Sequence, residues 1–205
     1  FGPTAKPNYS SYIAEDGERF ELGDVEIQVL HTPGHTMESS SFLLTDENGK
    51  HNAVFTGDTL FIGDVGRPDL AVKSDLTKED LASLLYESLQ TKILPLADEV
   101  IVYPAHGAGS QCGKNLSSET VSTIGEQRKF NYALQPMTKE QFVEVVTEGI
   151  PAPPPYFPEN ARINREGYGN INEILERNLK ALSLKDFKSA INDGALVLDS
   201  RHENF

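Results

Sequence analysis

A series of glycine-containing loops between residues 32 and 69 constrains this chain most, because each loop follows a hydrophobic segment and carries a polar side chain. Their sequences are Thr32-Pro33-Gly34-His35-Thr36, Thr56-Gly57-Asp58-Thr59 and Gly63-Asp64-Val65-Gly66-Arg67-Pro68-Asp69. Loops at strand ends orient functional side chains, and imidazole with carboxylate is a common donor set for hydrolytic and redox metal ions. We therefore expect His35 and Asp58 to bind a metal ion, in preference to ordinary turn roles bonded to the backbone.

Short apolar segments around these loops predict a β-sheet. The predicted strands cover residues 19–22, 25–30, 41–44, 53–55 and 99–103. Residues 25–30 alternate apolar and polar side chains, which is typical of a strand with one buried face. The last strand, 99–103, leads into the loop that bears His106.

Helical signals follow in the second half of the chain. The clearest lies between Ser74 and Leu94, where Thr77 provides a hydroxyl cap and apolar residues recur at helical spacing. Those apolar residues, which we expect to face the core, are Leu81, Leu84, Leu85 and Leu89. Further helices are predicted at 117–132 (capped at Ser117 or Ser118), after a capping box that starts at Thr138, at 170–182 and after Ser183.

The loops also match a known family. The segments TPGHT (32–36), FTGDTLF (55–61) and YPAHG (103–107) resemble the later half of a metallo-β-lactamase-fold domain. This resemblance implies an α/β fold, the αββα sandwich of that family, in which His35 and Asp58 bind metal. The continuation GDVGRPDL (63–70) is similar to the persulfide dioxygenase branch, which implies one non-haem Fe(II) per domain, with zinc as the alternative metal.

The upstream metal-binding motif of that family, His-x-His-x-Asp-His, is absent from the sequence. The histidines are His31, His35, His51, His106 and His202. We therefore expect the chain to be an incomplete piece whose missing N-terminal part supplies another metal ligand. Without that ligand it should hold metal weakly.

Further residues are candidates for the active site. In dizinc relatives the histidine that matches His106 binds a second metal, whereas the iron branch implies an active-site residue without a bond to iron. Arg67 fits either a surface salt bridge or, as the resemblance favours, a catalytic guanidinium that binds an anionic thiol-derived substrate. Cys112 fits a small buried residue. It also fits a substrate-binding thiol. In that case nearby Lys114 would lower the pKa of the Cys112 thiol, which could then take up persulfide sulfur.

The C-terminal part has a different composition. Residues 151–155 are rich in proline, which interrupts regular structure. The segment 183–205, with a predicted helix, a predicted strand at 195–199 and an Asp-x-Arg sequence, resembles the start of an α/β rhodanese-like domain. We expect a metallo-β-lactamase-like domain at 1–150, a linker and helix at 151–182, and an incomplete rhodanese-like domain at 183–205.

Composition narrows the function classes. The net charge of −13 and the pI near 4.8 disfavour nucleic acid and anionic membranes as partners. No apolar run approaches the roughly 20 residues of a membrane span. The single cysteine fits a reducing cytoplasm.

The resemblance implies iron-dependent oxidation of a small-molecule thiol persulfide by dioxygen to sulfite, a reaction of sulfide detoxification, and it is compatible with a homo-oligomer. One alternative is a dizinc glyoxalase II-like thioester hydrolase, against which the 63–70 sequence argues. The other alternative is a metal-free sulfur-carrier or scaffold module.

Overall fold

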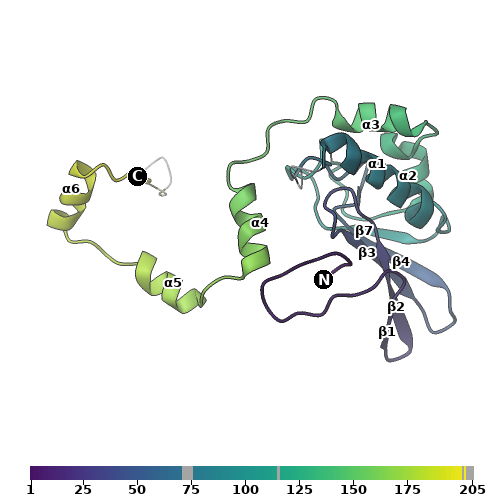
Figure 1. Cartoon of the computed structure of the whole chain (residues 1–205), viewed down its shortest axis with the longest axis horizontal. Helices are drawn as coiled ribbons and strands as arrows, with labels where there is room; N and C mark the ends of the chain where they lie inside the picture. The colour runs from purple at the N-terminus through teal and green to yellow at the C-terminus, as the bar shows by residue number, and fades with distance from the viewer. Residues whose placement is uncertain (71–75, 115, 200, 202–205) are drawn as a thin grey trace. The chain divides into compact units, whose positions relative to one another are not determined.

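A computed structural model of the chain describes residues 1–70, 76–114, 116–199 and 201. The chain divides into two compact units, Phe1–Gly167 and Tyr168–Phe205. Figure 1 shows the order of the elements along the chain. All the residues predicted for the site belong to the first unit. Ser74, at the start of the clearest helical signal, and His202 lie outside the described residues.

A mixed sheet forms the centre of the first unit. Its strands lie in the order β1-β2-β3-β4-β7-β8. Their bounds are Arg19–Leu22, Val25–His31, Ser40–Thr45, His51–Gly57, Ile101–Pro104 and Ser122–Thr123. Neighbouring strands are antiparallel except β4 and β7, which are parallel. Beside this sheet, β5 (Leu60–Phe61) and β6 (Asp64–Val65) form a two-stranded ribbon. The predicted strands between residues 19 and 103 are confirmed, with small shifts at their ends.

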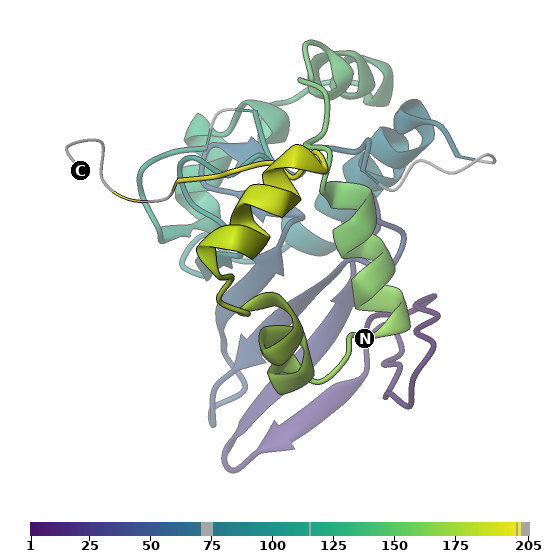
Figure 2. The ribbon, with the colours of Figure 1, turned by 90° about the vertical axis from the view of Figure 1, so that its left-hand side faces the viewer.

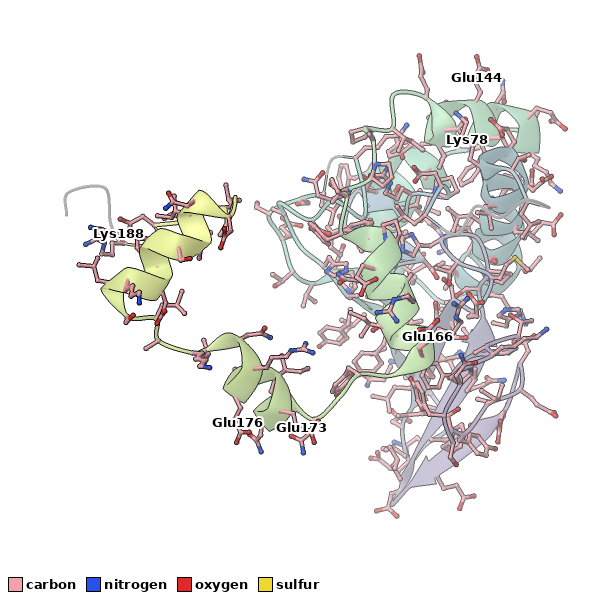
Figure 3. All side chains as sticks on the ribbon, turned by 60° about the vertical axis from the view of Figure 1, so that its left-hand side comes forward. Lys78, Glu144, Glu166, Glu173, Glu176 and Lys188 are labelled. Atoms are coloured by element: carbon pink, nitrogen blue, oxygen red, sulfur yellow. The ribbon has the colours of Figure 1, made fainter. Side chains whose placement is uncertain are left out.

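Helices α1 (Lys78–Ser88), α2 (Ile124–Phe130) and α3 (Lys139–Thr147) gather on one side of the sheet (Figures 1 and 2). The facing surfaces of sheet and helices form a buried apolar core, which includes Leu43, Val54, Leu85, Leu89, Val102 and Phe142. α1 continues as a π-helical turn, Leu89–Ile93. Of the predicted stripe, Leu84 alone is only partly buried. Charged side chains such as Lys78 and Glu144 lie on the outside of α1 and α3 (Figure 3).

The helix α3 begins at the capping box that the sequence predicts. The Thr138 hydroxyl accepts a hydrogen bond from the Gln141 amide at 3.3 Å, and Gln141 Oε1 accepts one from the Thr138 amide at 2.9 Å. Because alanine leaves the Gln141 amide without its cap, we expect Thr138→Ala to lower the free energy of unfolding by about 1 kcal/mol. Urea denaturation measures this loss. The control is Thr147→Ala in the same helix, whose hydroxyl donates back to the Val143 and Glu144 carbonyls and caps no amide. An equal loss in both variants would contradict the capping role.

Two predicted elements differ from the structure. The helix predicted over 117–132 begins at Ile124 and its cap is Thr123, not Ser117 or Ser118. The residues just before it are extended because they pair with β7 as strand β8, and tertiary pairing overrides local propensity. The strand predicted at 195–199 is also wrong, since these residues are neither helix nor strand. A short apolar run needs a partner strand, and the described part of the chain offers it none.

The proline-rich segment has no regular structure, as predicted, but it leads into a helix that the sequence did not indicate, α4 (Phe157–Glu166). In the second unit, α5 (Ile171–Asn178) and α6 (Leu184–Asn192) begin after the side-chain caps Asn170 and Ser183. Neither helix contains a buried residue, and their charged side chains, such as Glu173, Glu176 and Lys188, project from the ribbon (Figure 3). Among the described residues, each helix is too short or too polar to cross a membrane.

Candidate metal centre

The predicted site residues come together because strands β2, β4 and β7 run in the same direction. β2 and β4 are each antiparallel to β3, and β4 is parallel to β7. The C-terminal ends of these strands therefore lie at one edge of the sheet, and the loops that follow them carry His35, Asp58 and His106. Gly34 lets the first loop approach α1 closely, because a Cβ at this position would lie 2.4 Å from the Cβ of Leu85.

His35 is prepared to act as a metal ligand. Its side chain is buried, with 6% of the residue exposed, and Nδ1 lies 2.9 Å from the carbonyl oxygen of Arg67. A carbonyl only accepts, so Nδ1 carries the proton and Nε2 keeps a lone pair for a metal ion. Burial is the largest influence on the pKa of His35 and lowers it, which keeps the ring neutral near pH 7.

Asp58 has one buried carboxylate oxygen, Oδ1, without a hydrogen bond from the described residues. Its Oδ1 lies 3.1 Å from Nε2 of His106, a close contact without the alignment of a hydrogen bond. This oxygen is buried and accepts no hydrogen bond from the residues that the structure describes. Burying an unpaired carboxylate oxygen is costly, and a bound cation would offset that cost.

Cys112 lies in the same cluster. One ligand atom from each of His35, Asp58 and Cys112 lies within 4.8 Å of the others. Burial is the main cause that raises the pKa of the Cys112 thiol, and the charge of Asp58 raises it further. Of the two alternatives that the sequence left open for Cys112, the thiol with a lowered pKa is therefore wrong. Lys114, the nearby cation in that alternative, donates through Nζ to the carbonyl oxygens of Val145 and Glu148.

Arg67 lies in a buried network of protein acceptors. Its side chain is 1% exposed. Nε and Nη2 donate to the two carboxylate oxygens of Asp69, at 2.6 Å and 2.7 Å. Nη1 donates to the Gln111 carbonyl at 3.2 Å, and Nη2 also donates to the Pro151 carbonyl. Asp69 thus neutralises the guanidinium charge, and the substrate contact expected for Arg67 stays a prediction.

Sequence reasoning missed the role of Asp64, which is fully buried. Its Oδ2 accepts a hydrogen bond from the Lys114 amide at 2.6 Å, and its Oδ1 accepts one from the Tyr132 hydroxyl at 2.9 Å. Burial raises the pKa of Tyr132, so its hydroxyl remains protonated and can donate. The sequence signal for this role is an acidic residue inside an apolar ribbon, since such a carboxylate must find internal donors.

The residues present fit a divalent metal ion. An unpaired carboxylate oxygen, a neutral imidazole with its lone pair available and a thiol lie close together. Nitrogen, oxygen and sulfur donors of this kind suit iron(II) or zinc. Such a set is smaller than a full coordination shell, so it leaves room for substrate and for another protein ligand.

Known proteins show the same sequence pattern. A family model described as the metallo-beta-lactamase superfamily matches residues 2–106. A mitochondrial persulfide dioxygenase of Bos taurus is 33% identical over 140 residues, which cover 68% of this chain and 47% of that protein. The hydroxyacylglutathione hydrolase GloC of Haemophilus influenzae is 33% identical over 130 residues, which cover 61% of this chain and 50% of the hydrolase. The chain thus spans about half the length of these curated relatives.

The fold also matches a solved structure. A metallo-beta-lactamase from Staphylococcus aureus has a TM-score of 0.72 to this chain at 34% identity, and the match covers 80% of this chain and 48% of that one. This similarity confirms the α/β class expected from the sequence. Because the family model matches residues 2–106, more than half of the 205 residues, the chain belongs to the metallo-beta-lactamase superfamily.

Proposed function

We propose that this chain carries part of the active site of an iron-dependent persulfide dioxygenase, in which His35 and Asp58 hold the metal. The observation that supports this most is how the 63–69 loop packs on both ligands. The Arg67 carbonyl binds His35, and Gly66 packs so tightly that a Cβ there would lie 1.8 Å from the Asp58 carbonyl oxygen. The sequence of this loop is the part that resembles the dioxygenase branch, and the similarity to the bovine persulfide dioxygenase supports the same assignment.

The proposed reaction converts a thiol persulfide, dioxygen and water into a thiol, sulfite and two protons. The outer sulfur of the persulfide is oxidised and dioxygen is reduced. Iron, when bound, would bring the sulfur and dioxygen together and let electrons pass between them. The protein's part is to hold these groups in place and to balance their charge.

The remaining site residues have supporting parts in this proposal. His106 lies against Asp58 Oδ1 and orients that carboxylate without binding iron. The Cys112 thiol lies beside Asp58 and His35, where it contacts the outer sulfur of the persulfide. Because its pKa is raised, it meets the persulfide anion as a neutral thiol, which avoids repulsion between two negative charges.

A thioester hydrolase is the second candidate, and the position of His106 favours it. His106 Nε2 lies 3.1 Å from Asp58 Oδ1, so the two side chains would be able to share a second metal ion. The similarity to hydroxyacylglutathione hydrolase GloC supports this alternative. Two zinc ions would then generate hydroxide near neutral pH.

Oxygen uptake separates these candidates. The full-length protein is purified without oxygen, loaded with iron(II) and mixed with glutathione persulfide. We expect uptake of dioxygen with equal formation of sulfite, because both oxygen atoms enter the same product. Thioester cleavage by the zinc-loaded protein, with no oxygen uptake by the iron-loaded one, would replace the dioxygenase with the hydrolase. A protein that binds neither metal would support the sulfur-carrier module.

The other expectations about the whole protein are part of the same proposal. Residues 183–205 would belong to a rhodanese-like domain, on the resemblance of their sequence alone. A cytoplasmic location and a homo-oligomeric assembly are proposed with it. Chromatography with light scattering would measure the assembly.

A further inference from the structure

The loop that carries Cys112 is fixed on both sides of the thiol. On one side, the Arg67 amide donates to the Cys112 carbonyl at 2.9 Å and Arg67 Nη1 donates to the Gln111 carbonyl at 3.2 Å. On the other side, the Lys114 amide donates to Asp64 Oδ2 at 2.6 Å. Both anchoring residues belong to the 63–69 loop, so that loop determines where the Cys112 backbone lies.

Arg67 also fixes the metal ligand. Its carbonyl accepts the hydrogen bond from His35 Nδ1 at 2.9 Å, while its own amide binds the Cys112 carbonyl. A single residue therefore connects His35 to Cys112 through the two ends of its backbone. The distance between the ligand and the thiol depends on how firmly this residue is held.

The guanidinium holds Arg67 in place. Both carboxylate oxygens of Asp69 and the carbonyls of Gln111 and Pro151 accept its hydrogen bonds. A forked cation makes these contacts at once, whereas an ammonium group of lysine has neither the shape nor the reach. Each nitrogen of the Arg67 guanidinium thus donates a hydrogen bond to a protein acceptor, so the side chain has a structural role at the site.

We propose that Arg67 is a positioning residue, which holds the Cys112 loop so that the thiol lies beside His35 and Asp58. A role of the Cys112 thiol in the reaction rests on the proposed function. The position of the thiol is independent of that function, and it can be measured in the metal-free protein without any catalytic turnover. A failure of this inference is therefore distinct from a failure of the dioxygenase assignment.

The test is the rate at which iodoacetamide alkylates Cys112 in the metal-free, native full-length protein, followed by mass spectrometry of the peptide that contains Cys112. We expect Arg67→Gln to raise this rate roughly tenfold, because charge-assisted hydrogen bonds that restrain the loop are lost. Loss of the positive charge by itself would have the opposite effect, since the charge of Arg67 lowers the pKa of the thiol. A faster reaction therefore reports movement of the loop.

Arg128→Gln is the matched control. Arg128 also donates to one carboxylate, that of Asp98, and to two backbone carbonyls, those of Leu94 and Leu96. It makes no such bond to the Cys112 loop in the described part of the chain, so we expect its variant to lose stability without a change in the alkylation rate. An equal increase in both variants would reduce the role of Arg67 to general stability and would overturn the proposal.

Two more variants keep the proposal testable if Arg67→Gln does not fold. Arg67→Lys retains the charge but not the fork, and we expect it to react like Arg67→Gln. A parental rate in this variant would show that charge is sufficient and would overturn the positioning role. Asp69→Asn keeps the arginine and weakens its strongest pair, so we expect a smaller increase in rate, and an unchanged rate would count against the proposal.

Discussion

Asp58→Ala should remove metal binding and oxygen uptake together. Asp58 supplies the charged oxygen of the cluster, and its Oδ1 is buried without a hydrogen-bond donor among the described residues. His35 is neutral there, because burial lowers its pKa, so nothing else in the His35–Asp58 pair balances the charge of a divalent ion. Loss of an outer partner of a metal ligand already costs about 10- to 100-fold in affinity, so we expect at least about a 100-fold loss for the ligand itself.

Calorimetric titration with iron(II) under anaerobic conditions measures the loss of affinity, and oxygen uptake with persulfide measures the loss of activity. Asp24→Ala is the control, since Asp24 is an exposed turn residue remote in sequence from the site loops. Asp58→Asn separates charge from shape, because the amide keeps the size of the side chain and removes its charge. Parental affinity in Asp58→Ala would show that the metal lies elsewhere.

The sequence predicts best those features whose cause is local. The caps at Thr77, Thr138 and Ser183 are confirmed because the hydroxyl and the amide that it accepts from are separated by only three residues. The strands before the site are confirmed because the alternation of apolar and polar residues indicates which side chains face the core. His35 and Asp58 could be assigned to one site for the same reason. Each follows a predicted strand, and strand ends lie at the edge of a sheet.

Features that depend on contacts between segments distant in the sequence are not indicated by local sequence patterns. The start of α2 was misplaced because β8 pairs with β7, some twenty residues earlier in the sequence. The alternative of a lowered pKa for Cys112 is wrong because burial raises it, and the ammonium of nearby Lys114 binds the end of α3. The acceptors of Arg67 at Gln111 and Pro151 lie 44 and 84 residues away in the sequence, so no local pattern indicates them.

Gly66→Ala should damage the site without changing any proposed ligand. A Cβ at this position would lie 1.8 Å from the Asp58 carbonyl oxygen and 3.1 Å from the Cβ of His35. Backbone atoms cannot rotate away as a flexible side chain can, so either Asp58 or the 63–69 loop has to move. We expect the free energy of unfolding to fall by about 1–3 kcal/mol, the usual cost of overpacking.

The same displacement should weaken metal binding by roughly 10- to 100-fold, because Asp58 and the Arg67 carbonyl that orients His35 both shift. Urea denaturation measures the first effect, and titration with iron(II) measures the second. Gly107→Ala is the matched control: a Cβ there meets nothing within 4 Å, although Gly107 directly follows His106, so stability and affinity should stay near parental values. If Gly66→Ala folds stably and binds metal with parental affinity, the packing of the 63–69 loop does not set the geometry of the ligands, and the main structural support for the proposed site is lost.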